Sequence, residues 1–111
     1  MLIEVRTNGS VEGAETLSDH VKTIVLNTLS RFEGRIRRVD VHLSDVVSNK
    51  SSHDDKRCMM EARLEGGEPI AVTQQATSID KAVHDTVHTL KRSIESALGR
   101  QSTLEQKRDH R

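Results

Sequence analysis

The alternation of apolar and polar residues predicts four strands and two helices in this chain. Residues 2–6, 36–46, 57–65 and 70–75 alternate with a period of two, which is typical of strands that bury one face. Residues 16–34 and 78–98 carry apolar residues at helical spacing instead. The expected order is strand, helix, strand, strand, strand, helix. We therefore expect a two-layer α+β sandwich, a β-α-β-β-β-α fold with both helices on one face of a four-stranded sheet.

The same alternation predicts which strand residues face the core. The inward positions are Ile3, Val5, Val39, Val41, Leu43, Cys58, Met60, Ala62 and Leu64. The open face of the sheet then carries Arg38, His42, Arg57, Met59, Glu61, Arg63, Thr73 and Gln75. No aromatic residue is among them, which argues against a surface on which single-stranded RNA bases stack.

The last helix has an unusual distribution of charge around its apolar stripe. The stripe consists of Ile79, Val83, Val87, Leu90, Ile94 and Leu98, all within about 60° of Val83 on a helical wheel. One flank gathers Lys81, His84, His88, Lys91 and Arg92, interrupted by Glu95 alone. The other flank carries Ala82, Thr89, Ser93 and Ser96, which are small and uncharged. Ser78 precedes the helix and is expected to cap its N-terminus.

The remaining segments are polar connections. Residues 47–56 lack a regular apolar pattern, so we expect a mobile loop there. Gly66 and Gly67 indicate a turn between the third and fourth strands. Residues 1–99 are expected to form one domain, and residues 100–111 a polar, disordered tail.

The overall charge does not favour a nucleic-acid partner. Seventeen Lys and Arg balance seventeen Asp and Glu, so any contact with phosphates must come from a local excess of cations. A second local excess lies where the first helix leads into a strand, at Arg31, Arg35, Arg37 and Arg38. These residues could meet phosphates or could simply form a solvated surface, and composition supports the two readings equally.

Catalytic and metal sites have weak support in the sequence. Cys58 falls on an inward strand position, where a thiol usually packs as a small apolar side chain. His84 and His88 have a spacing that could share a metal ion, with His53, Asp54 or Asp55 as a further ligand. Two solvated histidines are the simpler explanation. We expect a protein that is not an enzyme and that has no catalytic residues, no metal, no cofactor and no small-molecule substrate.

The expected compartment is the cytoplasm. A single cysteine cannot form an internal disulfide, and residues 1–9 lack the basic and apolar pattern of a signal peptide. No apolar stretch is long enough to cross a bilayer, so no membrane contact is expected.

Four segments resemble one known family over residues 2–98. They are IEVRTNG, LSDHVKTIVLNTLSRFEGRIRRVDVHLSD, EARLEGGEPIAVT and AVHDTVHTLKRSI. The family is that of the ribosome hibernation-promoting factor and ribosome-associated inhibitor A, also called sigma-54 modulation proteins. The resemblance is to its short form, without the C-terminal dimerisation domain of longer members.

This resemblance implies a fold, a function and a binding surface. Members share the β-α-β-β-β-α fold and silence translation under stress by occupying the messenger and transfer RNA channel of the small ribosomal subunit. A basic surface between and beside the helices contacts ribosomal RNA. In this chain that surface would comprise Lys22, Arg31, Arg35, Arg37, Arg38, Lys81, His84, His88, Lys91 and Arg92.

Two other functions stay open. The same fold could serve as a protein-interaction or regulatory module without ribosome binding, which the zero net charge favours. A generic double-stranded RNA binder is less favoured, because such domains start their last helix with several lysines and this helix has only Lys81 there. The sequence leaves the oligomeric state undetermined.

Overall fold

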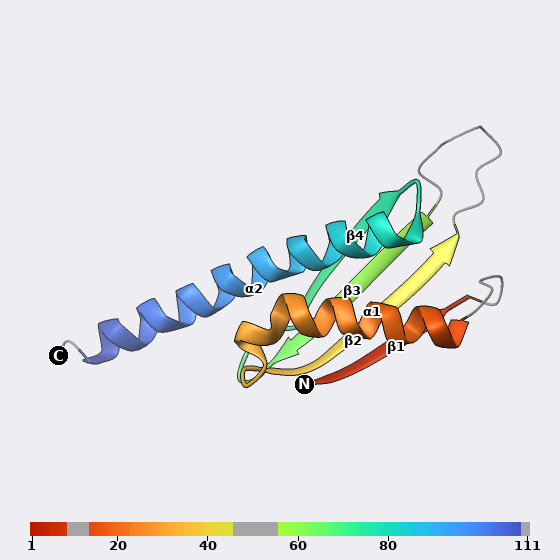
Figure 1. Ribbon diagram of the computed structural model, residues 1–111. Coiled ribbons are helices and arrows are strands. Elements are labelled where there is room, and N and C mark those ends of the chain that lie inside the picture. The colour runs from red at the N-terminus through yellow and green to blue at the C-terminus, as the bar shows by residue number, and fades with distance from the viewer. Residues whose placement is uncertain (9–13, 46–55, 110–111) are drawn as a thin grey trace.

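The computed structural model describes residues 1–8, 14–45 and 56–109 and has the expected order of elements. The strands are β1 (Leu2–Thr7), β2 (Ile36–Asp45), β3 (Lys56–Leu64) and β4 (Ile70–Ala76). The helices are α1 (Ala14–Leu29), a 3-10 turn η1 (Ser30–Phe32) and α2 (Ile79–Asp109). Both α-helices cover one face of the sheet (Figure 1), which confirms the predicted α+β fold.

The four strands lie side by side in their order along the chain. β1 pairs with β2 in parallel, and β3 pairs antiparallel with both β2 and β4. The parallel pair is possible because α1 provides the crossover from β1 to β2. The β3–β4 turn contains Gly66 at φ 70°, a left-handed conformation that glycine adopts without strain.

The core is almost entirely aliphatic and lies between the helices and the sheet. The predicted inward residues of β2 and β3 are all buried, and Ile3 and Val5 pack against them. The stripe of α2 is confirmed as well, since Val83, Val87, Leu90 and Ile94 are fully buried. Phe32, the only aromatic residue of the chain, is buried where η1 closes the end of the core. Ser78 caps α2 as expected, accepting a hydrogen bond from the Lys81 amide at 3.1 Å.

A β-bulge interrupts the start of β2. Ile36 pairs with Leu64 and Arg38 with Arg63, so Arg37 is an extra residue without an opposite partner. Simple alternation would place Ile36 and Arg38 on the same face. The bulge instead buries Ile36 in the core and leaves Arg38 on the open face.

The helix boundaries differ from those expected. α1 begins at Ala14 rather than at residue 16, because Ala14 and Glu15 are good helix formers. The backbone of α2 continues through Gly99 to Asp109, beyond the expected end at residue 98. A glycine costs a helix only about 1 kcal/mol relative to alanine, and the residues after it favour helix. The division into a domain over residues 1–99 and a disordered tail over 100–111 stays a prediction. The expected loop over residues 47–56 lies almost wholly outside the described residues.

Candidate nucleic-acid interface

The helix face is organised by a contact between the two helices. α1 and α2 run in the same direction (Figure 1), and His20 of α1 lies 3.0 Å from Asp80 in the first turn of α2. Arg31 lies in η1, directly after the end of α1, and Lys91 lies on α2 well beyond this contact. Because the two helices run in the same direction, both cations lie on the same side of the contact.

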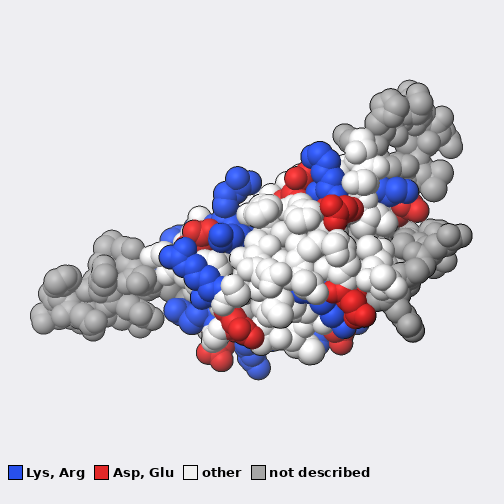
Figure 2. Space-filling view, in the orientation of Figure 1, with Lys and Arg blue, Asp and Glu red and all other residues white. Residues whose placement is uncertain are grey.

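Positive charge gathers at that end of the helix face. Figure 2 shows Lys and Arg concentrated where α1 ends and α2 continues, and uncharged atoms over the middle of the face. At that end Arg31 and Arg92 are exposed and Lys91 is half-buried, whereas the exposed Lys22 lies next to the contact, two residues after His20. The Arg31 guanidinium carbon lies 5.7 Å from the centre of the Phe32 ring, a cation–π contact that holds it near the end of α1.

The start of α2 carries less available charge than its sequence suggests. Lys81 Nζ lies 2.9 Å from Asp85, and His84 Nε2 lies 3.8 Å from Asp80. The rings of His84 and His88 stack with their centres 6.4 Å apart. Within the described residues, Lys22, Lys91 and Arg92 form no ion pair. They are therefore helix-face cations that can turn to an outside phosphate without losing an internal partner.

Two of the predicted site residues do not lie with the helices. Arg38 projects from the open face, where its guanidinium lies 2.9 Å from Asp40 and 2.7 Å from Glu4. Arg37 lines a depression of about 510 Å³ together with Arg38 and Arg63. Arg35 is exposed at the corner between the two layers. Arg37 and Arg38 thus lie on the sheet side, Arg35 lies at the corner, and Arg31 lies in η1 beside the end of α1.

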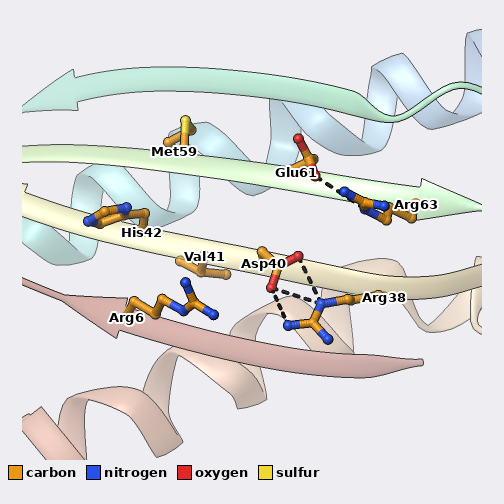
Figure 3. A pocket seen from close by; sticks show the side chains of 8 residues that line it. All are labelled: Arg6, Arg38, Asp40, Val41, His42, Met59, Glu61 and Arg63. Carbon is orange, nitrogen blue, oxygen red and sulfur yellow. Dashed lines mark hydrogen bonds and ion pairs between the residues drawn. The ribbon is translucent and has the colours of Figure 1, made fainter.

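The open face forms a mixed-charge surface. A hollow of about 420 Å³ is lined by Arg6, Arg38, Asp40, Val41, His42, Met59, Glu61 and Arg63 (Figure 3). Three carboxylates form a row across neighbouring strands, with Asp40 opposite both Glu4 and Glu61. Like charges in such positions repel one another, and the arginines beside the row offset this repulsion. The Arg38 guanidinium donates hydrogen bonds of 2.9 Å to the Asp40 carboxylate, and these hold the pKa of Asp40 below its usual range. The face has no Phe, Tyr or Trp, as the sequence indicates, and His42 provides its one described aromatic ring.

Cys58 lies in the core rather than in a site. Burial raises the pKa of its thiol to about 11, so the reactive thiolate is scarce at neutral pH. Among the described residues, no group of three His, Cys, Asp or Glu could hold a metal ion. His53, Asp54 and Asp55, considered as ligands, lie outside those residues, and the absence of a metal or cofactor stays a prediction. No described helix is long and apolar enough to cross a membrane.

The contact between His20 and Asp80 is a feature that the sequence does not reveal. The two residues are far apart in the chain, and neither interrupts an apolar pattern. Only the packing of α1 beside α2 brings them together and extends the polar cluster of His84 and His88 onto α1.

The chain belongs to the sigma 54 modulation protein / S30EA ribosomal protein family, whose model matches residues 6–102. The fold is similar to the N-terminal domain of Protein Y from Thermus thermophilus, with a TM-score of 0.68 and 18% identity, covering 86% of this chain and 98% of that one. It is also similar to a ribosomal subunit interface protein from Coxiella burnetii, with a TM-score of 0.66 and 15% identity, covering 89% and 99%. A search of curated proteins found no match. The family resemblance of the sequence is thereby confirmed.

Proposed function

We propose that this protein is a translation-silencing factor that binds the small ribosomal subunit and occupies its messenger and transfer RNA channel. Family membership is the observation that carries the proposal, because the family description names a ribosomal protein. The name of the Coxiella protein likewise refers to the ribosomal subunit interface. The partner would be ribosomal RNA together with the small subunit, in the cytoplasm, and no catalysis is involved.

The arrangement of cations supports the helix face as the RNA-binding surface. Lys22, Lys91 and Arg92 lie on or beside the two helices without an internal ion pair among the described residues. Phosphate contacts need exposed cations but no aromatic rings, which suits a chain whose single aromatic residue is buried. The full set proposed for this surface is Lys22, Arg31, Lys81, His84, His88, Lys91 and Arg92, with Arg35 at the corner. Arg37 and Arg38 would contact RNA only if it also reached the sheet side.

Sedimentation with purified ribosomal subunits tests the proposal. We expect the protein to pellet with the small subunit at low salt and to be released progressively between about 50 and 200 mM salt, because phosphate contacts displace condensed counterions. The large subunit alone is the matched control. Failure to pellet at low salt would contradict the proposal and favour a regulatory module with a protein partner.

A further inference from the structure

The two edges of the sheet differ in charge. β1 forms one edge and carries Glu4 and Arg6, whereas β4 forms the other and carries no charged residue. The uncharged stretch extends from residue 69 to residue 79 in a chain of which 31% of residues are charged. An edge strand exposes N–H and C=O groups that can pair with another chain, and proteins usually prevent this with charges or proline. β4 lacks both within its seven residues.

The surroundings of β4 leave this edge accessible. In the part of the chain that the structure describes, β4 pairs with β3 on one side only, and Figure 1 shows it at the margin of the sheet. Ala71, Thr73 and Gln75 are exposed on the open face. The edge is thus a regular strand of seven residues, about 24 Å long, with one side unpaired.

The flank of α2 that borders β4 is also uncharged. The Gln74 side-chain amide donates a hydrogen bond to Thr89 Oγ1 at 3.3 Å, which identifies the flank concerned. From Ala82 to Ser93 most side chains on this flank are small and neutral, and Thr86 is fully buried against Cys58 of β3. Asp85, one turn before Thr89, borders the flank, but its charge is paired with Lys81 at 2.9 Å. A chain that approaches β4 therefore meets no unpaired charge from this part of the helix.

We propose that two copies of this chain associate through β4, pairing antiparallel about a two-fold axis so that the two four-stranded sheets become continuous. A two-fold axis brings residues near it close to their own counterparts, so any charge there would face a like charge. β4 is free of that repulsion over its whole length. The β1 edge would bring Glu4 towards its own counterpart, close to a row that already holds Asp40 and Glu61.

The size of this contact predicts a weak dimer. A single strand edge with part of a helix flank buries less than the roughly 800 Å² per partner of a standard stable interface. We expect a dissociation constant on the order of 100 μM, so that association depends on protein concentration.

Sedimentation equilibrium of the purified full chain tests the proposal. We expect the wild-type mass to rise towards twice that of one chain as the concentration increases. Thr73→Lys and Thr73→Glu should each weaken association at least about 10-fold by opposing like charges across the axis, and an equimolar mixture of the two should restore it. Thr23→Lys, the same change on α1, should behave as the wild type does.

Hydrogen exchange locates the contact. The amides of β4 (Ile70–Ala76) should exchange more slowly at high than at low wild-type concentration, while those of β1 stay unchanged. Circular dichroism melts at low concentration should be similar for all variants. A wild type that stays monomeric up to about 1 mM, or slower exchange in β1 instead of β4, would overturn the proposal. Equal association of the wild type and Thr73→Lys would overturn it as well.

Discussion

The cations of the helix face and those of the open sheet face have different neighbours. On the sheet face, Arg38 lies within 3 Å of both Asp40 and Glu4, and Arg63 Nε lies 3.4 Å from Glu61. On the helix face, Lys91 and Arg92 have no such partner among the described residues. Arg38 and Arg63 stabilise a row of carboxylates, whereas Lys91 and Arg92 are available to an outside anion. The division is not complete, because Arg57 on the sheet face has no ion pair among the described residues and Lys81 on the helix face is paired with Asp85. The number of cations on a surface therefore says less about binding than the acids next to them.

The helix face and the open sheet face are separated by the core. The reactivity of the buried Cys58 thiol measures how well that core excludes solvent. Because burial raises the pKa of this thiol to about 11 from 9.0, we expect thiol reagents at pH 8 to react at least 100-fold more slowly with the native protein than with the unfolded chain. The measurement is the rate of modification by a chromogenic disulfide reagent. A Thr23→Cys variant with Cys58→Ala should react rapidly when native. Rapid native labelling of Cys58 would show that the core opens.

Matched neutralisation of the two faces compares their contribution to RNA binding. Lys91→Gln with Arg92→Gln should weaken binding to the small subunit about 50-fold near 0.1 M salt, since each lost phosphate contact removes one released counterion. Arg6→Gln with Arg63→Gln removes two charges from the sheet face and should change affinity less than 3-fold. Quantitative pelleting over a salt series gives the affinities of both variants. The logarithm of the binding constant should fall less steeply with the logarithm of the salt concentration for the helix-face variant. Equal losses would mean that both faces contact RNA.

Removing Arg38 should lower stability rather than binding. Arg38→Gln leaves Glu4 and Asp40 opposite each other on neighbouring strands, so the free energy of unfolding at pH 7 should fall. Arg38 lowers the pKa of Asp40, so their interaction stabilises the fold above the ordinary value of 3.8 and is lost as the pH falls below it. The difference in the free energy of unfolding between Arg38→Gln and the wild type should therefore be smaller in acid. Urea unfolding at pH 7 and pH 3 measures this difference.

Arg6→Gln is the control for that experiment. Arg6 is 73% exposed and lies 3.6 Å from Glu4, so its loss should affect stability less than the loss of Arg38. A larger effect of Arg6→Gln would contradict the assignment of Arg38 as the main partner of the acidic row.

The smallest expected effect concerns the histidines. His84→Gln with His88→Gln should lower affinity for the small subunit by about 2- to 3-fold, because the two rings can donate hydrogen bonds to phosphate oxygens. His42→Gln, on the sheet face, should leave affinity unchanged. Quantitative pelleting with the small subunit measures both variants. An unchanged affinity of the double variant would exclude a role for the pair in phosphate contact.

Much of the fold could be predicted because it depends on local periodicity. The inward residues of β2 and β3 and the stripe of α2 follow directly from periods of two and 3.6 residues. The end of α2 could not be placed, because Gly99 weakens a helix without stopping it. The candidate site was predicted less well than the fold. Alternation correctly places Arg38 on the open face, but the family resemblance grouped Arg37 and Arg38 with the helix surface, and the structure has both on the sheet side.

The sequence by itself determined the element order, the aliphatic core and the two contrasting flanks of α2, because each depends on residues a few positions apart. The tertiary structure decided which charges remain available. Three of its features join segments that are distant in the chain. They are the bulge at Arg37, the contact between His20 and Asp80, and the pairing of Arg38 with Glu4. Electrostatic interactions depend on distance in space, and only the packed sheet and helices fix those distances.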